Sequence, residues 1–134
     1  MSRRAASVAA EALVLDEALS FWGGLDPETG TIVDPHHPQV GACVTGTVLV
    51  LPGTRGSTNS AGTLLESLRT GAGPVAVVGR RPDAAIAVAC SVAGRLYGRD
   101  VPYVLVGADV YAGLTSGERL TIDVATATLV DRTP

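Results

Sequence analysis

A strand, a glycine-rich loop and a helix follow one another in the middle of this chain, and this order restricts the possible folds more than any other feature. Residues 45–51 (TGTVLVL) form a β-rich run that ends at a proline. The loop of residues 53–60 (GTRGSTNS) then leads into residues 61–69, whose leucines share one helical face. This succession is typical of a domain in which helices cover a partly parallel sheet.

The rest of the sequence repeats this alternation and then changes to a hairpin. The expected helices are residues 61–69 and 84–96, and the expected strands are residues 12–15, 31–34, 45–51, 75–78, 103–106, 120–124 and 128–130. The last two strands have alternating apolar residues, which predicts a terminal hairpin. The sequence therefore predicts a single α/β domain over residues 1–134, with a mixed sheet and two main helices on one side of it.

Local signals mark the ends of the two helices. Thr63 and Glu66 have the spacing of a capping box for the first helix, and Asn59 or Ser60 could also cap it. Asp83 is expected to start the second helix, and a glycine ends each of them. The second helix is apolar on most faces, so it is either deeply buried or packs against another chain.

Composition and the N-terminus exclude several classes of protein. With 46% hydrophobic and 17% charged residues, the chain is neither disordered nor a coiled coil. A net charge of −3 gives no reason to expect a nucleic-acid or membrane partner. Arg3 and Arg4 precede small apolar residues, as in a signal peptide, but acidic residues interrupt that run and no run is long enough to span a membrane. We expect a soluble protein whose residues 1–10 are frayed or loosely docked.

The two cysteines, Cys43 and Cys90, lie far apart in apolar stretches and are interpreted as small core residues. No CxxC pair is present, so the chain is not expected to hold a metal, and its own thiolates cannot carry an iron–sulfur cluster or a structural zinc. Two cysteines cannot build a disulfide scaffold either, and the expected compartment is a reducing cytoplasm.

The loop of residues 53–60 is the strongest candidate for a binding site. A glycine-rich turn exposes backbone N–H groups, and the following helix N-terminus carries a partial positive charge, so together they favour an anion. Arg55 adds a planar cation suited to a carboxylate or phosphate, and Ser57, Thr58 and Ser60 add hydroxyl groups. The equally weighted alternative is an ordinary loop with capping residues and a solvated arginine.

Two other groups of residues stand out. The turn that contains Asp34, His36 and His37 lacks the spacing of a metal site, so a rigid turn with exposed imidazoles is favoured, with a possible hydrogen bond from Asp34 to one histidine. Trp22, the single tryptophan, is expected to be a core residue or an interface anchor.

A combination of short motifs resembles the swivel domain of aconitase X, the small subunit of two-subunit aconitase X enzymes. The resemblance covers nearly the whole chain, from about Leu13 to Val130. The matching residues are Phe21-Trp22-Gly23-Gly24, Thr29-Gly30, Ile32, Asp34, His37-Pro38, Gly41, Leu51-Pro52, Arg55-Gly56-Ser57, and the segments 72–78 (AGPVAVV) and 117–124 (GERLTIDV).

This resemblance implies a swivelling β/β/α fold and a hydro-lyase shared between two chains. A large catalytic subunit would carry an iron–sulfur cluster, whose iron acts as the Lewis acid for the departing hydroxyl, and the present chain would bind no cofactor itself. Ser57 matches the position of the catalytic serine, which acts as the base. Arg55, Gly56, Asn59, Ser60 and Thr58 would bind the substrate or its charge, although Thr58 and Asn59 depart from the commoner serine-rich run.

The resemblance leaves the substrate and some residue roles open. The family acts on cis-3-hydroxy-L-proline or on mevalonate 5-phosphate, and the arginine-only, alanine-rich composition of a GC-rich genome favours the first. Asp34 and His37 match family positions and are read as structural or interface residues. The alternatives are a non-catalytic module that binds a carboxylate or phosphate, and a purely structural assembly subunit. The isolated chain could also form a homo-oligomer.

Overall fold

The computed structural model describes residues 7–56 and 59–134. The strands are β1 (Ser7–Val14), β2 (Val48–Val50), β3 (Ala76–Gly79), β4 (Tyr103–Leu105), β5 (Arg119–Asp123) and β6 (Thr128–Thr133). The helices are α1 (Phe21–Gly24), α2 (Ser60–Thr70), α3 (Ala84–Tyr97) and α4 (Ala108–Gly113). None of the helices in these two ranges is both long and apolar enough to cross a membrane.

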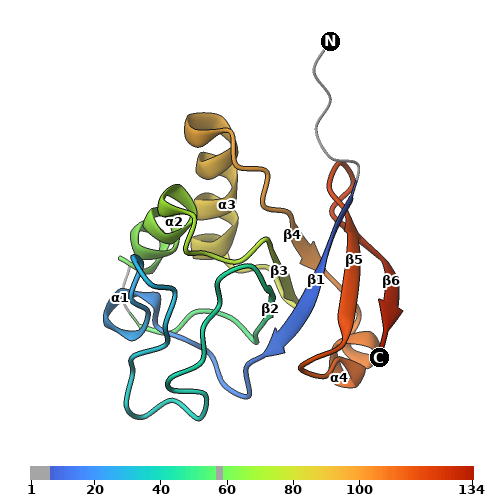
Figure 1. Ribbon diagram of the computed structural model, residues 1–134, viewed down its shortest axis with the longest axis horizontal. Coiled ribbons are helices and arrows are strands. Elements are labelled where there is room, and N and C mark those ends of the chain that lie inside the picture. The colour runs from blue at the N-terminus through green and yellow to red at the C-terminus, as the bar shows by residue number, and fades with distance from the viewer. Residues whose placement is uncertain (1–6, 57–58) are drawn as a thin grey trace.

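The strands form one mixed sheet with the order β4-β3-β2-β1-β5-β6 in the described part of the chain. The pairs from β1 to β4 are parallel, whereas β1–β5 and β5–β6 are antiparallel. The two outer strands, β4 and β6, approach each other, so the sheet is curled (Figure 1). The predicted α/β class, with a mixed sheet, two main helices and a terminal hairpin, is confirmed.

Alternate residues of the central strands fill two separate cores. Leu49 and Val77 face α2 and α3, whose buried residues include Leu64 and Ile86. The neighbouring strand positions face the opposite side, where residues of β5 and the region around α4 cover them. Figure 1 shows the same arrangement, with α2 and α3 on one side and the β5–β6 hairpin and α4 on the other. Successive side chains of a strand point to opposite faces of the sheet, and both faces of this part of the sheet are covered. These strands are therefore apolar on both faces.

The start of the chain differs from the prediction. The expected strand of residues 12–15 begins at Ser7, so the expected fraying of residues 1–10 is wrong for residues 7–10. Ser7 to Glu11 pair with β5, and Ala12 to Val14 pair with β2. Residues 1–6 lie outside the described part.

Other predictions need correction as well. Residues 31–34 do not form a strand, because Thr31 and Ile32 make only isolated bridges to Cys43 and Leu25. The capping box at the start of α2 is also wrong, because Thr63 lies inside the helix. Helix α4 was not expected from the sequence.

Residues 21–24 form α1, whose interior is not helical. Trp22 has ψ 115° and Gly23 has φ 82°, so the backbone reverses within this short element. Asp83 stands at the start of α3, as predicted, and it caps the helix by accepting a hydrogen bond from the Ile86 N–H.

Candidate functional site

The loop that joins β2 to α2, called here the β2–α2 loop, is described at residues 52–56 and at residue 59. Residues 52–56 follow β2 at the carboxyl edge of the parallel strands, and residue 59 leads into α2. The segment before α1 runs beside it. The Leu19 N–H donates to the Gly53 carbonyl, and the Arg55 N–H donates to the Leu19 carbonyl, each at 3.2 Å. The carboxyl edge is where open α/β sheets place their ligand sites, and the N-terminus of α2 adds its partial positive charge there.

Two glycines permit the path of this loop. Gly53 has φ 152° and Gly56 has φ 82°, both in the region that side chains disfavour. A Cβ on Gly53 would lie 3.1 Å from Asp83 Oδ2, so the glycine also permits close approach of that carboxylate.

Asp83 joins the start of α3 to the β2–α2 loop. Its Oδ2 accepts hydrogen bonds from the Thr54 N–H at 2.7 Å and from Thr54 Oγ1 at 2.9 Å. Partial burial acts to raise the pKa of Asp83, but the hydrogen bonds from Thr54 and from the α3 backbone outweigh it and hold the pKa below its ordinary value. The carboxylate is therefore ionised at neutral pH.

Arg55 forms an ion pair that lies at the surface of the protein and is not buried. Its NH2 group lies 3.2 Å from Glu17 Oε1, and the two side chains remain 53% and 49% exposed. An exposed pair of this kind contributes only about 0–1 kcal/mol, so an anionic ligand can compete for the guanidinium.

The end of the loop forms the N-terminus of α2. Asn59 occupies the N-cap position, and its carbonyl accepts the Thr63 N–H at 3.2 Å. Ser60 is buried, and its Oγ has no hydrogen-bond partner among the described residues. Ser57 and Thr58, to which the sequence assigns the catalytic and a binding role, lie outside the described residues.

His37 is buried, at 4% exposure, so the prediction of exposed imidazoles is wrong for this residue. Its Nδ1 accepts the Gln39 N–H at 3.0 Å, which places the proton on Nε2, 3.2 Å from the Glu17 carbonyl. His37 thus supports the backbone of the residue whose carboxylate holds Arg55. Asp34 Oδ1 accepts the His36 N–H at 2.9 Å and fixes the same turn.

Trp22 is not a core residue, because 57% of it is exposed. Its carbonyl accepts a hydrogen bond from Ser20 Oγ at 2.9 Å. That hydroxyl oxygen also lies 3.7 Å from where a Cβ on Gly56 would stand. The exposed indole therefore belongs to a turn that adjoins the β2–α2 loop.

The sequence did not single out Glu17 or Thr54 as part of this site, and it assigned Asp83 only to the start of a helix. One signal could have found Asp83: the carboxyl ends of neighbouring parallel strands meet at one edge, so the segment after β3 must adjoin the loop after β2. Glu17 gave no such signal, since its role depends on a non-local contact.

The cysteines occupy different environments. Cys90 is buried, as predicted, and burial raises the pKa of its thiol to about 12. Cys43 is exposed, so its interpretation as a core residue is wrong; its Sγ lies 3.2 Å from Thr45 Oγ1. No group of three metal-ligating side chains is found in residues 7–56 and 59–134.

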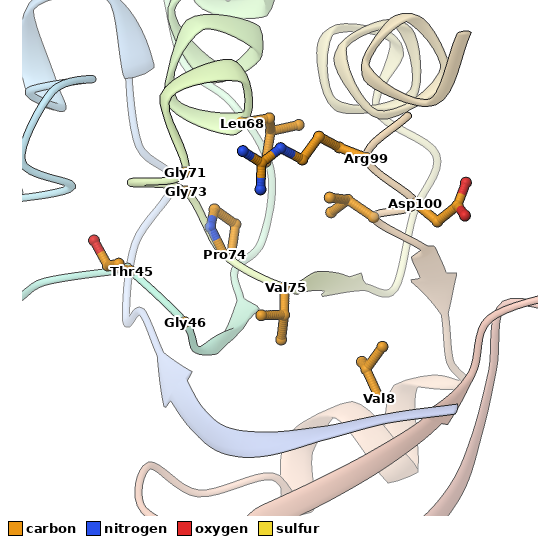
Figure 2. A pocket seen from close by; sticks show the side chains of 11 residues that line it. Val8, Thr45, Gly46, Leu68, Gly71, Gly73, Pro74, Val75, Arg99 and Asp100 are labelled. Atoms are coloured by element: carbon orange, nitrogen blue, oxygen red, sulfur yellow. The ribbon is translucent and has the colours of Figure 1, made fainter. Parts of the chain in front are cut away.

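A hollow of about 300 Å³ lies at the opposite, amino edge of the parallel strands (Figure 2). Arg99 extends into it below the last turn of α2, and its NH2 lies 3.7 Å from where a Cβ on Gly71 would stand. A cation at a helix C-terminus offsets the partial negative charge there, so this arginine has a structural explanation and the hollow does not compete as the anion site.

Comparisons with known proteins agree on one family. The family profile described as aconitase X swivel domain matches residues 2–130. The chain is 40% identical over 103 residues to cis-3-hydroxy-L-proline dehydratase of Pseudomonas aeruginosa, covering 77% of this chain and 18% of the relative. It is 47% identical over 83 residues to the phosphomevalonate dehydratase small subunit of Methanopyrus kandleri, covering 62% of each. The chain thus spans less than two thirds of the length of these relatives.

A solved structure is similar over nearly the whole chain. A chain in the crystal structure of Thermococcus kodakaraensis aconitase X (holo-form) superposes with a TM-score of 0.79 at 26% identity. The match covers 93% of the present chain and 91% of that chain. The fold and the sequence therefore point to the same group of proteins.

Proposed function

Because this chain belongs to the aconitase X swivel domain family, we propose that it is the small subunit of a hydro-lyase that dehydrates a small hydroxy acid in a site shared with a large subunit. The observation that carries this proposal is the β2–α2 loop, in which Arg55 and Gly56 follow β2 at the carboxyl edge of the sheet and precede α2 in the chain. That combination suits a carboxylate group.

We propose cis-3-hydroxy-L-proline as the substrate. The Pseudomonas aeruginosa relative that carries this substrate in its name is 40% identical, and the arginine-only composition supports the same choice. Mevalonate 5-phosphate is the second candidate, because several relatives are named phosphomevalonate dehydratase small subunit, and the one from Methanopyrus kandleri is 47% identical over 83 residues. Both compounds present a carboxylate to the loop.

In the proposed reaction, Ser57 is the base. Its Oγ, as the alkoxide, takes the proton from the carbon beside the substrate carboxylate. The electron pair of that C–H bond forms a C=C bond and the C–O bond of the hydroxyl breaks. The proton held by Ser57 then passes to the departing hydroxide, so that water leaves and the alkoxide is regenerated. The N-terminus of α2 and the Gly56 backbone lower the cost of the alkoxide, while Arg55 binds the carboxylate.

We assign the iron–sulfur cluster of the proposed enzyme to the large subunit. The donor set of this chain does not fit a cluster, because Cys43 is exposed beside Thr45 whereas Cys90 is buried in α3. A thiolate is the form that binds a metal, and the pKa of about 12 keeps Cys90 protonated. This chain would contribute the loop and its helix terminus to the shared site.

Ser57→Ala tests the proposal in the complex with the large subunit. We expect turnover of cis-3-hydroxy-L-proline to fall on the order of 10²–10⁴-fold, because the base is removed, while the two chains still co-purify. Ser91→Ala, which removes an exposed hydroxyl on α3, is the matched control and should leave turnover unchanged. Retained activity in Ser57→Ala would exclude the serine as the base.

Ligand binding and complex formation distinguish the hydro-lyase from the alternative function, a non-catalytic binding module. A non-catalytic anion-binding module would bind a carboxylate or phosphate as an isolated chain and would form no stable complex with a large subunit. If the wild-type complex turns over mevalonate 5-phosphate but not cis-3-hydroxy-L-proline, the hydro-lyase proposal stands and the proposed substrate changes to mevalonate 5-phosphate.

A further inference from the structure

The Asp83 carboxylate divides its two oxygens between two segments. Oδ1 lies 3.2 Å from the Ile86 N–H and caps α3. Oδ2 accepts both the N–H and the hydroxyl of Thr54, at 2.7 and 2.9 Å. Capping a helix needs only one acceptor, so the second oxygen is available for the β2–α2 loop without cost to α3.

Both sides of this contact are themselves held in place. The Tyr103 hydroxyl donates to the Arg81 carbonyl at 3.0 Å and so anchors the segment that leads to Asp83. On the other side, Leu19 bonds to the backbone of the residues that flank Thr54. These contacts fix residues 53–55 of the loop relative to the body of the domain, and Thr54 lies three residues before Ser57 in the sequence.

We propose that Asp83 is a positioning residue for the reaction: through Thr54, it holds the β2–α2 loop so that the proposed base is aimed at the substrate. This inference rests on the function proposed above. Asp83 acts on the loop and does not touch the substrate. Because misplacing a reacting group by about 1 Å can cost about 100-fold in rate, loss of this contact should reduce kcat more than it alters substrate binding.

Asp83→Ser separates the two roles of the side chain. A serine still caps a helix well, but its single, shorter hydroxyl cannot also reach Thr54. In the complex with the large subunit, we expect kcat to fall by about 10- to 100-fold, with KM changed by less than about threefold.

The partner residue supplies a second variant with a conservative rescue. Thr54→Val removes the hydroxyl and should lower kcat in the same direction, whereas Thr54→Ser keeps the hydroxyl and should remain near the wild-type rate. In a double variant, Asp83→Ser should lower kcat by a smaller factor on top of Thr54→Val than it does in the wild type. The hydroxyl bond is then already absent, and only the bond from the Thr54 N–H to Asp83 Oδ2 is left to break. Fully additive losses would contradict the proposal.

Asp123 provides a matched control remote from the loop. In the β5–β6 turn, its Oδ1 accepts the Thr126 N–H at 2.9 Å and Thr126 Oγ1 at 3.0 Å, which repeats the pattern of Asp83 and Thr54. Asp123→Ser should leave kcat unchanged. A comparable loss of kcat in this variant would overturn the proposal, because a general loss of stability would then explain the effect.

Amide hydrogen exchange on the full chain gives a readout that does not depend on turnover. In Asp83→Ser, the Thr54 amide should lose protection while the amides of α3 keep theirs. Unchanged protection at Thr54, or equal loss throughout α3, would overturn the positioning role. If the wild-type complex turns over neither substrate, the proposed function fails, and the exchange data still decide whether Asp83 holds the loop.

Discussion

Gly30 and Gly46 show how much a single residue depends on its surroundings. Both have positive φ, 74° and 70°. A Cβ on Gly30 would overlap Thr45 Oγ1 and the Ala72 carbonyl, whereas a Cβ on Gly46 would meet nothing within 4 Å. The first glycine is needed for conformation and for close packing, and the second for conformation alone.

Replacing each glycine by alanine should separate these two costs. Gly46→Ala should lower the free energy of unfolding by about 1–2 kcal/mol, the cost of a left-handed conformation. Gly30→Ala should cost about 1–3 kcal/mol more, because the carbonyl that it would overlap belongs to the backbone. Urea denaturation of the two variants measures the difference. Equal losses would show that the chain near Ala72 yields without strain.

At the scale of elements, carboxylates join segments that the sequence keeps apart. Glu118 is only 8% exposed and accepts the Thr115 N–H at 2.6 Å and Arg132 Nε at 2.8 Å. Arg132 also donates to the Gly113 carbonyl at 2.8 Å. This network connects the end of α4, the turn before β5 and the final strand. The Arg132 side chain, followed by Thr115, holds the pKa of Glu118 below its ordinary value.

These carboxylates make stability dependent on pH on the acidic side. Asp83 and Glu118 have pKa values lowered by folding, so their contribution is complete above the unfolded pKa values of 3.8 and 4.5. It is lost as the pH falls through the lower folded values. We expect the free energy of unfolding to decrease below about pH 4.5.

Glu118→Gln tests this origin. The variant should lose about 1–3 kcal/mol at pH 7, where the charged hydrogen bonds are intact in the wild type. It should also show a shallower decrease as the pH falls below the unfolded value of 4.5 and the wild-type carboxyl gains its proton. Denaturant titrations at several pH values measure both quantities. If the free energy of unfolding falls with pH equally steeply in the variant and the wild type, groups other than Glu118 cause the acid sensitivity.

The elements that could be predicted from sequence are those with strong local signals. Helix α3 has an aspartate cap and a terminal glycine, and the β5–β6 hairpin alternates apolar residues. Helix α4 spans only six residues and has no side-chain cap, so its local sequence carries little information. The first half of β1 contains serine and alanine, which have weak strand preference, and only pairing with β5 makes it a strand.

The residues of the candidate site divide in the same way, into those with a local sequence signal and those placed by contacts between distant segments. The position of the β2–α2 loop could be predicted because a strand and a helix flank it. The contacts of Glu17 and Asp83 with that loop could not, because each joins residues far apart in the chain. Cys43 was misplaced because apolar neighbours in sequence do not determine which side of a loop faces the solvent.

At the scale of the whole molecule, Trp22 tests which face of the chain would meet the proposed large subunit. Trp22→Ala should change the free energy of unfolding by less than about 0.5 kcal/mol, since 57% of the residue is exposed. Association with the large subunit should weaken by about 2 kcal/mol, or roughly 30-fold, if the indole anchors the interface. Calorimetric titration of the separate subunits measures this loss.

Val130 offers a control of equal exposure. It is also 57% exposed but lies on β6, at the other end of the sheet order from the parallel strands. Val130→Ala should leave association unchanged. Equal weakening by both variants would show that the interface is not centred on the turn beside the β2–α2 loop.

The central position of β1 has a consequence for how the chain is made. β1 is the first described strand to leave the ribosome, yet its antiparallel partner comes from the far end of the chain, where Glu11 pairs with Arg119. At roughly 5–20 residues per second, translation leaves one edge of β1 without its neighbour for on the order of ten seconds. During that interval a nascent chain presents an open strand edge, which other chains can pair with. Yield in the cell should therefore depend on chaperone capacity as well as on the stability of the finished domain.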